Sequence, residues 1–254
     1  AAALLAAGAL TLAGPYGWRH GTLFLVGGAL GLVLYHAAFG FTAAFRALVS
    51  VGDTRGLRAQ MLMLAVATVL FAPMLSAETV FGTEVVGAVA PAGFSVLLGA
   101  AVFAIGMQLA GGCGSGCLFN LGGGATSMLV ALVGFAAGSL VATAHAAFWR
   151  TLPSVGAVSL GDTLGWAPAV LLQLAVFAAI ALAAKAWERR RLGAVLPVQP
   201  PVRGWRRLVH GPWSLATGAV ALATLNALVV VLAGHPWGIT WGITLAGAKA
   251  GVLA

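Results

Sequence analysis

The sequence predicts an all-α integral membrane protein, a polytopic bundle of transmembrane helices. Of its 254 residues, 61% are hydrophobic and only 7% are charged, whereas a soluble domain carries about 25% charged residues. Several windows of about 20 residues hold almost no charge, and this length crosses a hydrocarbon core about 30 Å thick. The apolar runs are continuous and do not alternate with polar residues, which favours helices over a barrel.

Hydrophobic segments divide the chain into candidate spans. They lie at 1–14, 21–45, 59–76, 86–110, 125–148, 164–187, 213–233 and 238–254. The first and last segments look incomplete, and the first residue is Ala rather than Met. We therefore expect the chain to be a piece of a longer protein.

Charge gives the spans a direction. Lys and Arg total 13 against 5 Asp and Glu, a formal net charge of +8. In a soluble domain this excess would indicate nucleic acid binding, but basic residues collect in the cytoplasmic loops of membrane proteins, so no nucleic acid partner is expected. The basic connectors 46–58 and 185–211 are predicted to be cytoplasmic, and 77–86 and 150–163 to lie outside. The shortage of carboxylates disfavours a cation pathway.

A glycine-rich stretch, GGCGSGC at 111–117, interrupts one of these spans. The direction of the other crossings requires 86–124 to make one net inward passage and 125–148 to return outward. Each glycine costs about 1 kcal/mol relative to Ala within a helix, so a continuous helix through this stretch is disfavoured. We predict an interrupted span with a new helix starting at about Ala125.

The residues of this interruption are the first candidate pore or substrate-binding residues. Backbone that leaves the helical ladder at membrane depth is tolerated only against protein or a water-filled cavity, and successive glycine N–H groups can form an anion-binding concavity. An alternative is that the glycines allow helices to pack closely. The candidates are Gln108, Gly112, Cys113, Gly114, Ser115, Gly116, Cys117 and Asn120.

The two cysteines could be metal ligands, redox partners or polar lining. A structural zinc site needs about four ligands, and the histidines at 20, 36, 145, 210 and 235 do not cluster near them in sequence, so neither a metal nor another cofactor is expected. A buried Cys is most often a small hydrophobe. A thiol also offers a sulfur-bearing anion a weak, polarizable S–H donor, and weak contacts at several sites are what conduction requires.

A short internal repeat adds further candidates. HAAFGFTAAFRA at 36–47 is similar to HPWGITWGITLA at 235–246, although such a match can arise by chance. Inverted repeats with interrupted helices are typical of transporters, so His36, Gly40 and Gly238 are candidate pore residues. Arg46 and Lys249, which follow the two copies, could attract anions or extend to the membrane interface.

The repeat also predicts the organisation of the chain. We expect residues 1–254 to form a single membrane transport domain. The first repeat would span about 21–187, a basic cytoplasmic loop 188–211, and the start of a second, inverted repeat 212–254.

Four stretches resemble the YeeE/YedE family of membrane proteins. They are FGFTAAFRALVSVGDTRGLRAQMLMLA at 39–65, GMQLAGGCGSGCLFNLGGG at 106–124, GFAAGSLVATAH at 134–145 and NALVVVLAGHPWGITWGITLAGAK at 226–249. The resemblance implies a helical inverted repeat in the bacterial inner membrane, with short central loops, a narrow pore and no enzymatic activity. It implies thiosulfate as the substrate, Cys113 as a contact for its sulfur, and a small cytosolic sulfur-carrier protein as a partner. The family's further cysteines, one early and one in the second half, are not present in residues 1–254. Either the regions that hold them are missing from this piece of the protein, or this member handles a related substrate.

Other functions stay open at this point. Some members of the family are linked to selenium or other sulfur compounds. Cys113 and Cys117 could instead form a membrane dithiol that exchanges sulfane sulfur or electrons, although no obvious base or cation lies beside them in sequence. The chain could also be a structural subunit of a membrane complex.

Overall fold

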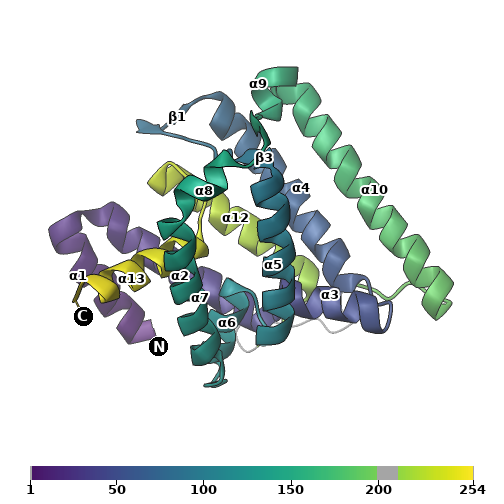
Figure 1. The fold of residues 1–254 in the computed structure, drawn as a ribbon, viewed down its shortest axis with the longest axis horizontal. Coiled ribbons are helices and arrows are strands. Elements are labelled where there is room, and N and C mark those ends of the chain that lie inside the picture. Colours follow the sequence, from purple (N-terminus) through teal and green to yellow (C-terminus); the bar gives the residue numbers. More distant parts are fainter. Residues whose placement is uncertain (1, 199–210, 254) are drawn as a thin grey trace. The chain divides into compact units, whose positions relative to one another are not determined.

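A computed structural model describes residues 2–198 and 211–253, which are mostly helical (Figure 1). The chain divides into two compact units. The first unit comprises Ala1–Phe39, Ala47–Ala88 and Leu160–Trp237. The second unit comprises Gly40–Arg46, Val89–Ser159 and Gly238–Ala254.

Each unit is built mainly from helices. The first contains α1 (Ala2–Tyr16), α2 (Trp18–Ala37), α4 (Arg55–Ser76), α9 (Leu160–Leu164), α10 (Trp166–Leu192), α12 (Leu215–Ala233) and a hairpin of β1 (Thr79–Val80) and β2 (Thr83–Glu84). The second contains α5 (Phe94–Ala110), α6 (Gly114–Gly122), α7 (Met128–Ala144), α8 (Ala146–Thr151), α13 (Ile239–Leu253) and the paired strands β3 (Pro91–Gly93) and β4 (Ser154–Ala157). Helix α3 (Phe41–Ser50) begins in the second unit and ends in the first.

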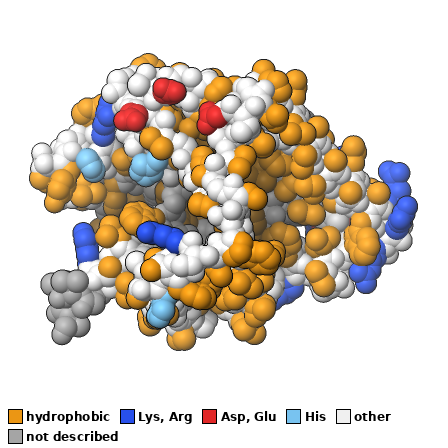
Figure 2. All heavy atoms as spheres, turned by 45° about the horizontal axis from the view of Figure 1, so that its top comes forward, with side chains coloured by type: hydrophobic (Ala, Val, Ile, Leu, Met, Phe, Trp, Pro, Cys, Tyr) orange, Lys and Arg blue, Asp and Glu red, His pale blue; other side chains and the backbone are white. Residues whose placement is uncertain are grey.

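The hydrophobic segments form helices long enough to span a bilayer. Among the described residues, five helical stretches have the required length and apolar composition: Trp18–Ser50, Arg55–Ser76, Phe94–Gly122, Trp166–Leu192 and Leu215–Ala233. Hydrophobic side chains are spread over much of the face in Figure 2. On α5 and α7, Val102 and Val130 are 71% and 78% exposed, an arrangement that suits hydrocarbon and is unfavourable in water. The prediction of an all-α, multi-pass membrane protein is confirmed.

Helix α12 lies at the centre of the first unit, where it packs against α2 and α4. Ala219, Leu30 and Val230 are almost fully buried at these contacts. The crossing of α12 with α2 is close, because a Cβ atom at Gly218 would lie 2.6 Å from the Ala37 Cβ. Small residues let membrane helices approach in this way, so the Gly- and Ala-rich composition of these spans serves their packing.

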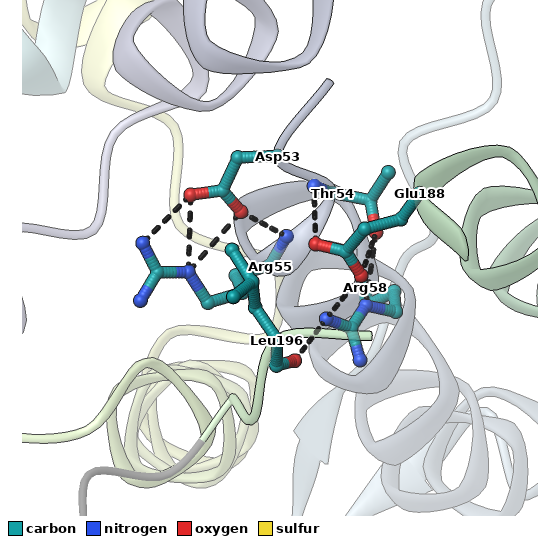
Figure 3. Close-up of polar contacts among 6 residues, drawn as sticks. All are labelled: Asp53, Thr54, Arg55, Arg58, Glu188 and Leu196. Atoms are coloured by element: carbon teal, nitrogen blue, oxygen red, sulfur yellow. Dashed lines mark hydrogen bonds and ion pairs between the residues drawn. The ribbon is translucent and has the colours of Figure 1, made fainter. Parts of the chain in front are cut away.

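A buried ion pair joins the start of α4 to the end of α10 (Figure 3). Arg58 Nη2 lies 2.9 Å from Glu188 Oε2, and the Glu188 side chain is fully buried. The Thr54 backbone N–H and hydroxyl donate to the two carboxylate oxygens at 3.2 and 3.1 Å. Arg58 also donates to the Leu196 carbonyl oxygen, beyond the end of α10. Every charge in this cluster is therefore paired and hydrogen-bonded, which a buried ion pair requires.

A second, more exposed ion pair lies beside this cluster (Figure 3). Arg55 Nη2 lies 2.7 Å from Asp53 Oδ2, and the Arg55 backbone N–H donates to the same carboxylate at 2.9 Å. These hydrogen bonds from Arg55 hold the pKa of Asp53 below its ordinary value, although partial burial opposes the shift. The ion pair and hydrogen bonds between Asp53 and Arg55 thus hold the conformation of the loop between α3 and α4.

The second unit contains a helical hairpin with a short helix at its turn. Helix α5 ends at Ala110, α6 follows after a three-residue break, and α7 begins at Met128. At the opposite end of the hairpin, β3 pairs antiparallel with β4, with Gly93 opposite Ser154. This pairing brings the start of α5 close to the segment that follows α8. An inward passage through 86–124 and a return through the next helix stay predictions.

Several boundaries differ from the sequence-based expectation. Parts of the connectors predicted at 46–58 and 185–211 are helical, because α3 ends at Ser50, α4 begins at Arg55 and α10 ends at Leu192. The apolar segment predicted from residue 86 becomes helical only at Phe94, because residues 91–93 are extended and pair with β4. The helix expected from about Ala125 begins at Met128. Residues 123–127 form turns closed by local bonds, such as Ala125 N–H to the Asn120 carbonyl oxygen at 3.0 Å.

The two copies of the proposed repeat have the same local organisation. Helix α2 is followed by a break and α3, and α12 is followed by a break and α13. The first break has Ala38 in the left-handed region, at φ 45°, and at the second the Trp237 N–H donates to Asn226 Oδ1 at 2.9 Å. The proposed repeat boundaries stay a prediction. Within the basic loop 188–211, residues 199–210, including Arg203, Arg206 and Arg207, lie outside the described residues.

Candidate functional site

The cysteine turn, residues 111–117, connects α5 to α6. Gly111 ends α5 in the left-handed region, at φ 77°, and Cys113 is extended, with φ −76° and ψ −179°. Helix α6 then begins at Gly114, so Cys113 occupies the N-cap position. A left-handed residue at the end of a helix is favourable for Gly and costly for most other residues. The glycine pattern therefore specifies the helix break that the sequence predicts.

Gly112 is required by close contact within the turn. A Cβ atom at this position would lie 3.0 Å from the Cys117 backbone nitrogen and 3.1 Å from Cys117 Sγ. The Cys117 N–H donates to the Cys113 carbonyl oxygen at 2.8 Å. The turn is thus folded tightly on the first turn of α6, and a Cβ atom at 112 would require its neighbours to shift by a few tenths of an ångström.

The two thiols have different surroundings. Cys117 Sγ donates to the Gly112 carbonyl oxygen at 3.4 Å, so its proton is used within the turn. Cys113 Sγ shares a hydrogen bond with Ser115 Oγ at 3.3 Å, and either atom can be the donor. Both residues are buried, at 7% exposure for Cys113 and 3% for Cys117, and both thiols are free. Among the described residues, no group of three or more His, Cys, Asp or Glu side chains could hold a metal ion.

A cavity of about 640 Å³ extends from the cysteine turn along α5 and α7. Gly112, Cys113, Gly114 and Cys117 line one part of it, and the rest is mainly apolar. Residues that line it from the three neighbouring helices include Met107, Ala110, Phe135, Ser139, Ala142 and Thr240. The volume is within the range of small-molecule sites, which are mostly apolar with a few polar groups.

A second cavity, of about 500 Å³, adjoins the first, because Ala142 lines both. It lies at the opposite end of the hairpin, and its polar lining residues include Ser95, Thr143, Arg150 and Ser154. Within the described part of the chain, the Arg150 side chain has neither an ion-pair partner nor a hydrogen bond. The two cavities together follow α5 and α7 from Arg150 to the cysteine turn.

Gln108 lies in the last turn of α5, where it connects this helix to α3. Its side-chain Nε2 donates to the Thr42 carbonyl oxygen at 3.3 Å. Arg46 Nη2 donates to the Gln108 carbonyl oxygen at 2.9 Å, and Arg46 Nε donates to Gln108 Oε1 at 3.4 Å. The Thr42 hydroxyl is buried and has no hydrogen-bond partner among the described residues. Gln108 therefore supports the helix that precedes the cysteine turn.

The other predicted site residues lie on several different elements of the fold. Ser115 and Gly116 belong to the first turn of α6, and Asn120, which is half-buried, lies near its end. A Cβ atom at Gly40 would lie 3.9 Å from the Phe119 ring, whereas one at Gly238 would have nothing within 4 Å. The second unit thus contains every predicted site residue except His36.

His36 belongs to the first unit, near the end of α2. Its ring stacks on Trp213, with the ring centroids 5.7 Å apart and an angle of 22° between the planes. Its carbonyl oxygen accepts a hydrogen bond from the Trp213 N–H at 2.8 Å. These contacts correspond to the packing role that a lone histidine often has, and none of them involves the cysteine turn.

Sequence patterns did not reveal Arg150 or Phe135 as lining residues. Arg150 stands in a loop with few charges, and Phe135 is one of many apolar residues of a span. The signal that could have drawn attention to Arg150 is its isolation, since no acidic residue lies between Glu84 and Asp162. Its approach to the start of α5 depends on the β3–β4 pairing, which no local pattern encodes.

Most of the chain matches a known protein family. Residues 36–254 match the protein-family model described as sulphur transport. A comparison with curated proteins finds no match. The family match includes the cysteine turn, both cavities and both helix breaks. The chain therefore belongs to the sulphur transport family, the YeeE/YedE family, and is a multi-pass membrane transporter of a sulfur compound.

Proposed function

We propose that the protein takes up a small sulfur-containing oxyanion, thiosulfate foremost, across the inner membrane of a bacterium. The observation that carries this proposal is the Cys113 thiol, which lines the cavity where α5 ends and α6 begins. Membership of a sulphur transport family supports a sulfur compound as the substrate. A thiol is the lining group best suited to contact sulfur, because it is polarizable and a weak hydrogen-bond donor.

The charges of the second unit favour an anion. This unit contains Arg46, Arg150 and Lys249, and its sequence includes no Asp or Glu. In surroundings of low dielectric constant, unbalanced positive charge attracts an anion strongly and repels a cation. Arg150 is the group we assign to the entrance from the periplasm, since positive-inside topology puts its loop outside. The substrate would then pass between α5 and α7 to the cysteine turn.

At the turn, Cys113 and the first turn of α6 would bind the substrate together. The first N–H groups of a helix have no partner within the helix, and they favour negative charge. The thiosulfate oxygens would accept hydrogen bonds from these N–H groups while its terminal sulfur contacts the Cys113 S–H. No covalent bond forms in this mechanism. Weak contacts of this kind allow the anion to leave as well as to enter.

Cys117 has a different role in this proposal. Its thiol already donates to the Gly112 carbonyl oxygen within the turn. This hydrogen bond stabilises the turn that holds Cys113. Because the Cys117 S–H already has an acceptor, it is a poorer donor for the substrate. We therefore assign the substrate contact to Cys113 and a supporting role to Cys117.

The cytoplasmic side would deliver the anion to a small sulfur-carrier protein. The last turn of α10 contains Arg189, Arg190 and Arg191, all of them exposed. A basic surface of this kind attracts an acidic partner and increases its rate of association. The remaining arginines of the loop lie outside the described residues.

Uptake of radiolabelled thiosulfate into proteoliposomes tests the proposal. We expect thiosulfate to enter, unlabelled thiosulfate to compete, and sulfate, which lacks the terminal sulfur, to compete poorly. Intact-mass spectrometry after exposure should find both thiols unmodified. A structural subunit would transport nothing, and a dithiol exchanger would accumulate a persulfide or a disulfide. Either of those results would contradict the proposal, and preference for a selenium or another sulfur oxyanion would correct the substrate.

A further inference from the structure

The cysteine turn lies between two helix ends of opposite polarity. Cys113 follows the C-terminus of α5 and caps the N-terminus of α6. A helix carries about half a negative elementary charge at its C-terminus and about half a positive charge at its N-terminus. An anion at Cys113 would therefore be attracted by α6 and repelled by α5. Some group must offset the end of α5 if an anion is to bind there.

Arg46 is placed to do this. Its Nη2 atom donates at 2.9 Å to the carbonyl oxygen of Gln108, one of the last four residues of α5. These are the carbonyl groups that lack a partner within a helix. The second contact, from Arg46 Nε to Gln108 Oε1, fixes the guanidinium against the same turn of the helix. A full positive charge thus lies directly on the negative end of α5.

The second unit has no carboxylate of its own to add negative charge near the turn. All five Asp and Glu residues of the chain belong to the first unit. Within the second unit, the negative end of α5 is therefore the main feature that opposes an anion at Cys113. The positive charge of Arg46 cancels the field of the negative α5 C-terminus. The electrostatic potential at Cys113 is then determined mainly by the positive N-terminus of α6.

We infer that Arg46 is the positioning residue that makes the cysteine turn selective for anions. It reverses the electrostatic contribution of the α5 C-terminus, and through Gln108 it also holds the last turn of the helix that leads to Cys113. This inference rests on the proposed function, since it assigns Arg46 a part in binding the substrate anion. It goes beyond attraction of anions into the pore, because the residue acts on a helix end rather than on the anion itself.

The test measures the potential at Cys113 without any transport. In a Cys117→Ser background, purified protein is labelled with an anionic methanethiosulfonate, the sulfonatoethyl reagent, and with a cationic one, the trimethylammonioethyl reagent. The ratio of the two rates reports the sign and strength of the local potential. We expect Arg46→Gln to lower the anionic-to-cationic ratio at least about fivefold, because a unit charge nearby acts on the two reagents in opposite directions.

Three further variants make the result specific. Arg46→Met is a second neutral variant in case the Gln protein does not insert, and we expect the same fall. Arg46→Lys loses the two-point contact with Gln108 but keeps the positive charge, so the ratio, which reports charge, should stay within about twofold of the parent protein. Lys249→Gln removes one positive charge from the same unit, near the end of α13, and should change the ratio much less.

Two results would overturn the inference. One is a ratio that the neutral variants leave unchanged. The other is an equally large fall of the labelling ratio in a control variant, either Arg46→Lys or Lys249→Gln. Such a fall would show that the charge on α5 is not the cause. Failure of thiosulfate uptake in the parent protein would instead contradict the proposed function and leave the labelling ratio readable.

Discussion

Arg58 and Glu188 form a buried ion pair that connects the beginning of α4 to the end of α10, with 2.9 Å between Nη2 and Oε2. The two residues are 130 positions apart in sequence. Only 7% of the Arg58 side chain is exposed, and none of the Glu188 side chain is. Removal of one partner would leave an uncompensated buried charge.

We predict that Glu188→Gln lowers the free energy of unfolding by about 3–5 kcal/mol, because Arg58 then keeps its charge without a counterion. Arg55→Gln is the matched control. It removes an ion pair whose Arg side chain is 44% exposed, and exposed pairs contribute about 1 kcal/mol or less. Thermal unfolding in detergent measures both. Equal losses of unfolding free energy in the two variants would show that the buried ion pair stabilises the fold no more than the exposed one.

A pH dependence follows from Asp53. Hydrogen bonds from Arg55 hold the pKa of Asp53 below its ordinary value, so the folded state favours the ionised carboxylate. This contribution to stability is complete above the unfolded-state pKa of about 3.9. It is lost as the pH falls through the lower pKa of the folded protein. We expect the stability difference between the parent protein and Asp53→Asn to be constant from pH 7 to about 5 and to shrink below about 4. A stability difference between the two proteins that grows as the pH falls would contradict this prediction.

Gly112→Ala should abolish or greatly reduce transport. The new Cβ atom would lie 3.0 Å from the Cys117 nitrogen and 3.1 Å from its sulfur, so the cysteine turn would have to move. Gly122→Ala, at the end of α6, is the control, because a Cβ atom there meets nothing within 4 Å. Uptake rates at equal amounts of inserted protein provide the comparison. Normal uptake by the Gly112 variant would mean that the geometry of the turn is not needed.

Arg150→Gln should raise the KM for uptake about tenfold while the maximal rate changes little, since a group at the entrance contributes to capture of the anion. The effect should weaken at high ionic strength, because exposed charges are screened. Arg19→Gln, in the first unit, is a suitable control. A fall in maximal rate with unchanged KM would place Arg150 at a later step than capture.

Local patterns predicted the helical fold and the helix break at the cysteine turn. Long apolar runs became helices, and the glycines of residues 111–117 ended one helix and began another. These features depend on neighbours in sequence. The sequence also singled out Cys113 and Cys117, but their spacing alone could not distinguish them. The difference arises from which oxygen each sulfur faces, Ser115 Oγ or the Gly112 carbonyl.

Contacts between distant segments could not be predicted in the same way. Glu188 was expected in a basic cytoplasmic loop, yet it is buried, because Arg58 and Thr54 come from another part of the chain to meet it. Arg46 reaches Gln108 across 62 positions of sequence. Each of these contacts forms only when the helices that hold its two residues pack together. Neither the hydropathy nor the spacing of the sequence predicts this packing.

In the proposed mechanism, Cys113 contacts the substrate while Cys117 supports the turn. The most direct measurement is the rate of thiosulfate uptake into proteoliposomes by Cys113→Ala and by Cys117→Ala, normalised to the amount of inserted protein. We predict that the Cys113 variant loses nearly all uptake and that the Cys117 variant retains a substantial part of it. Unchanged uptake by the Cys113 variant, or equal loss in both, would contradict the assignment.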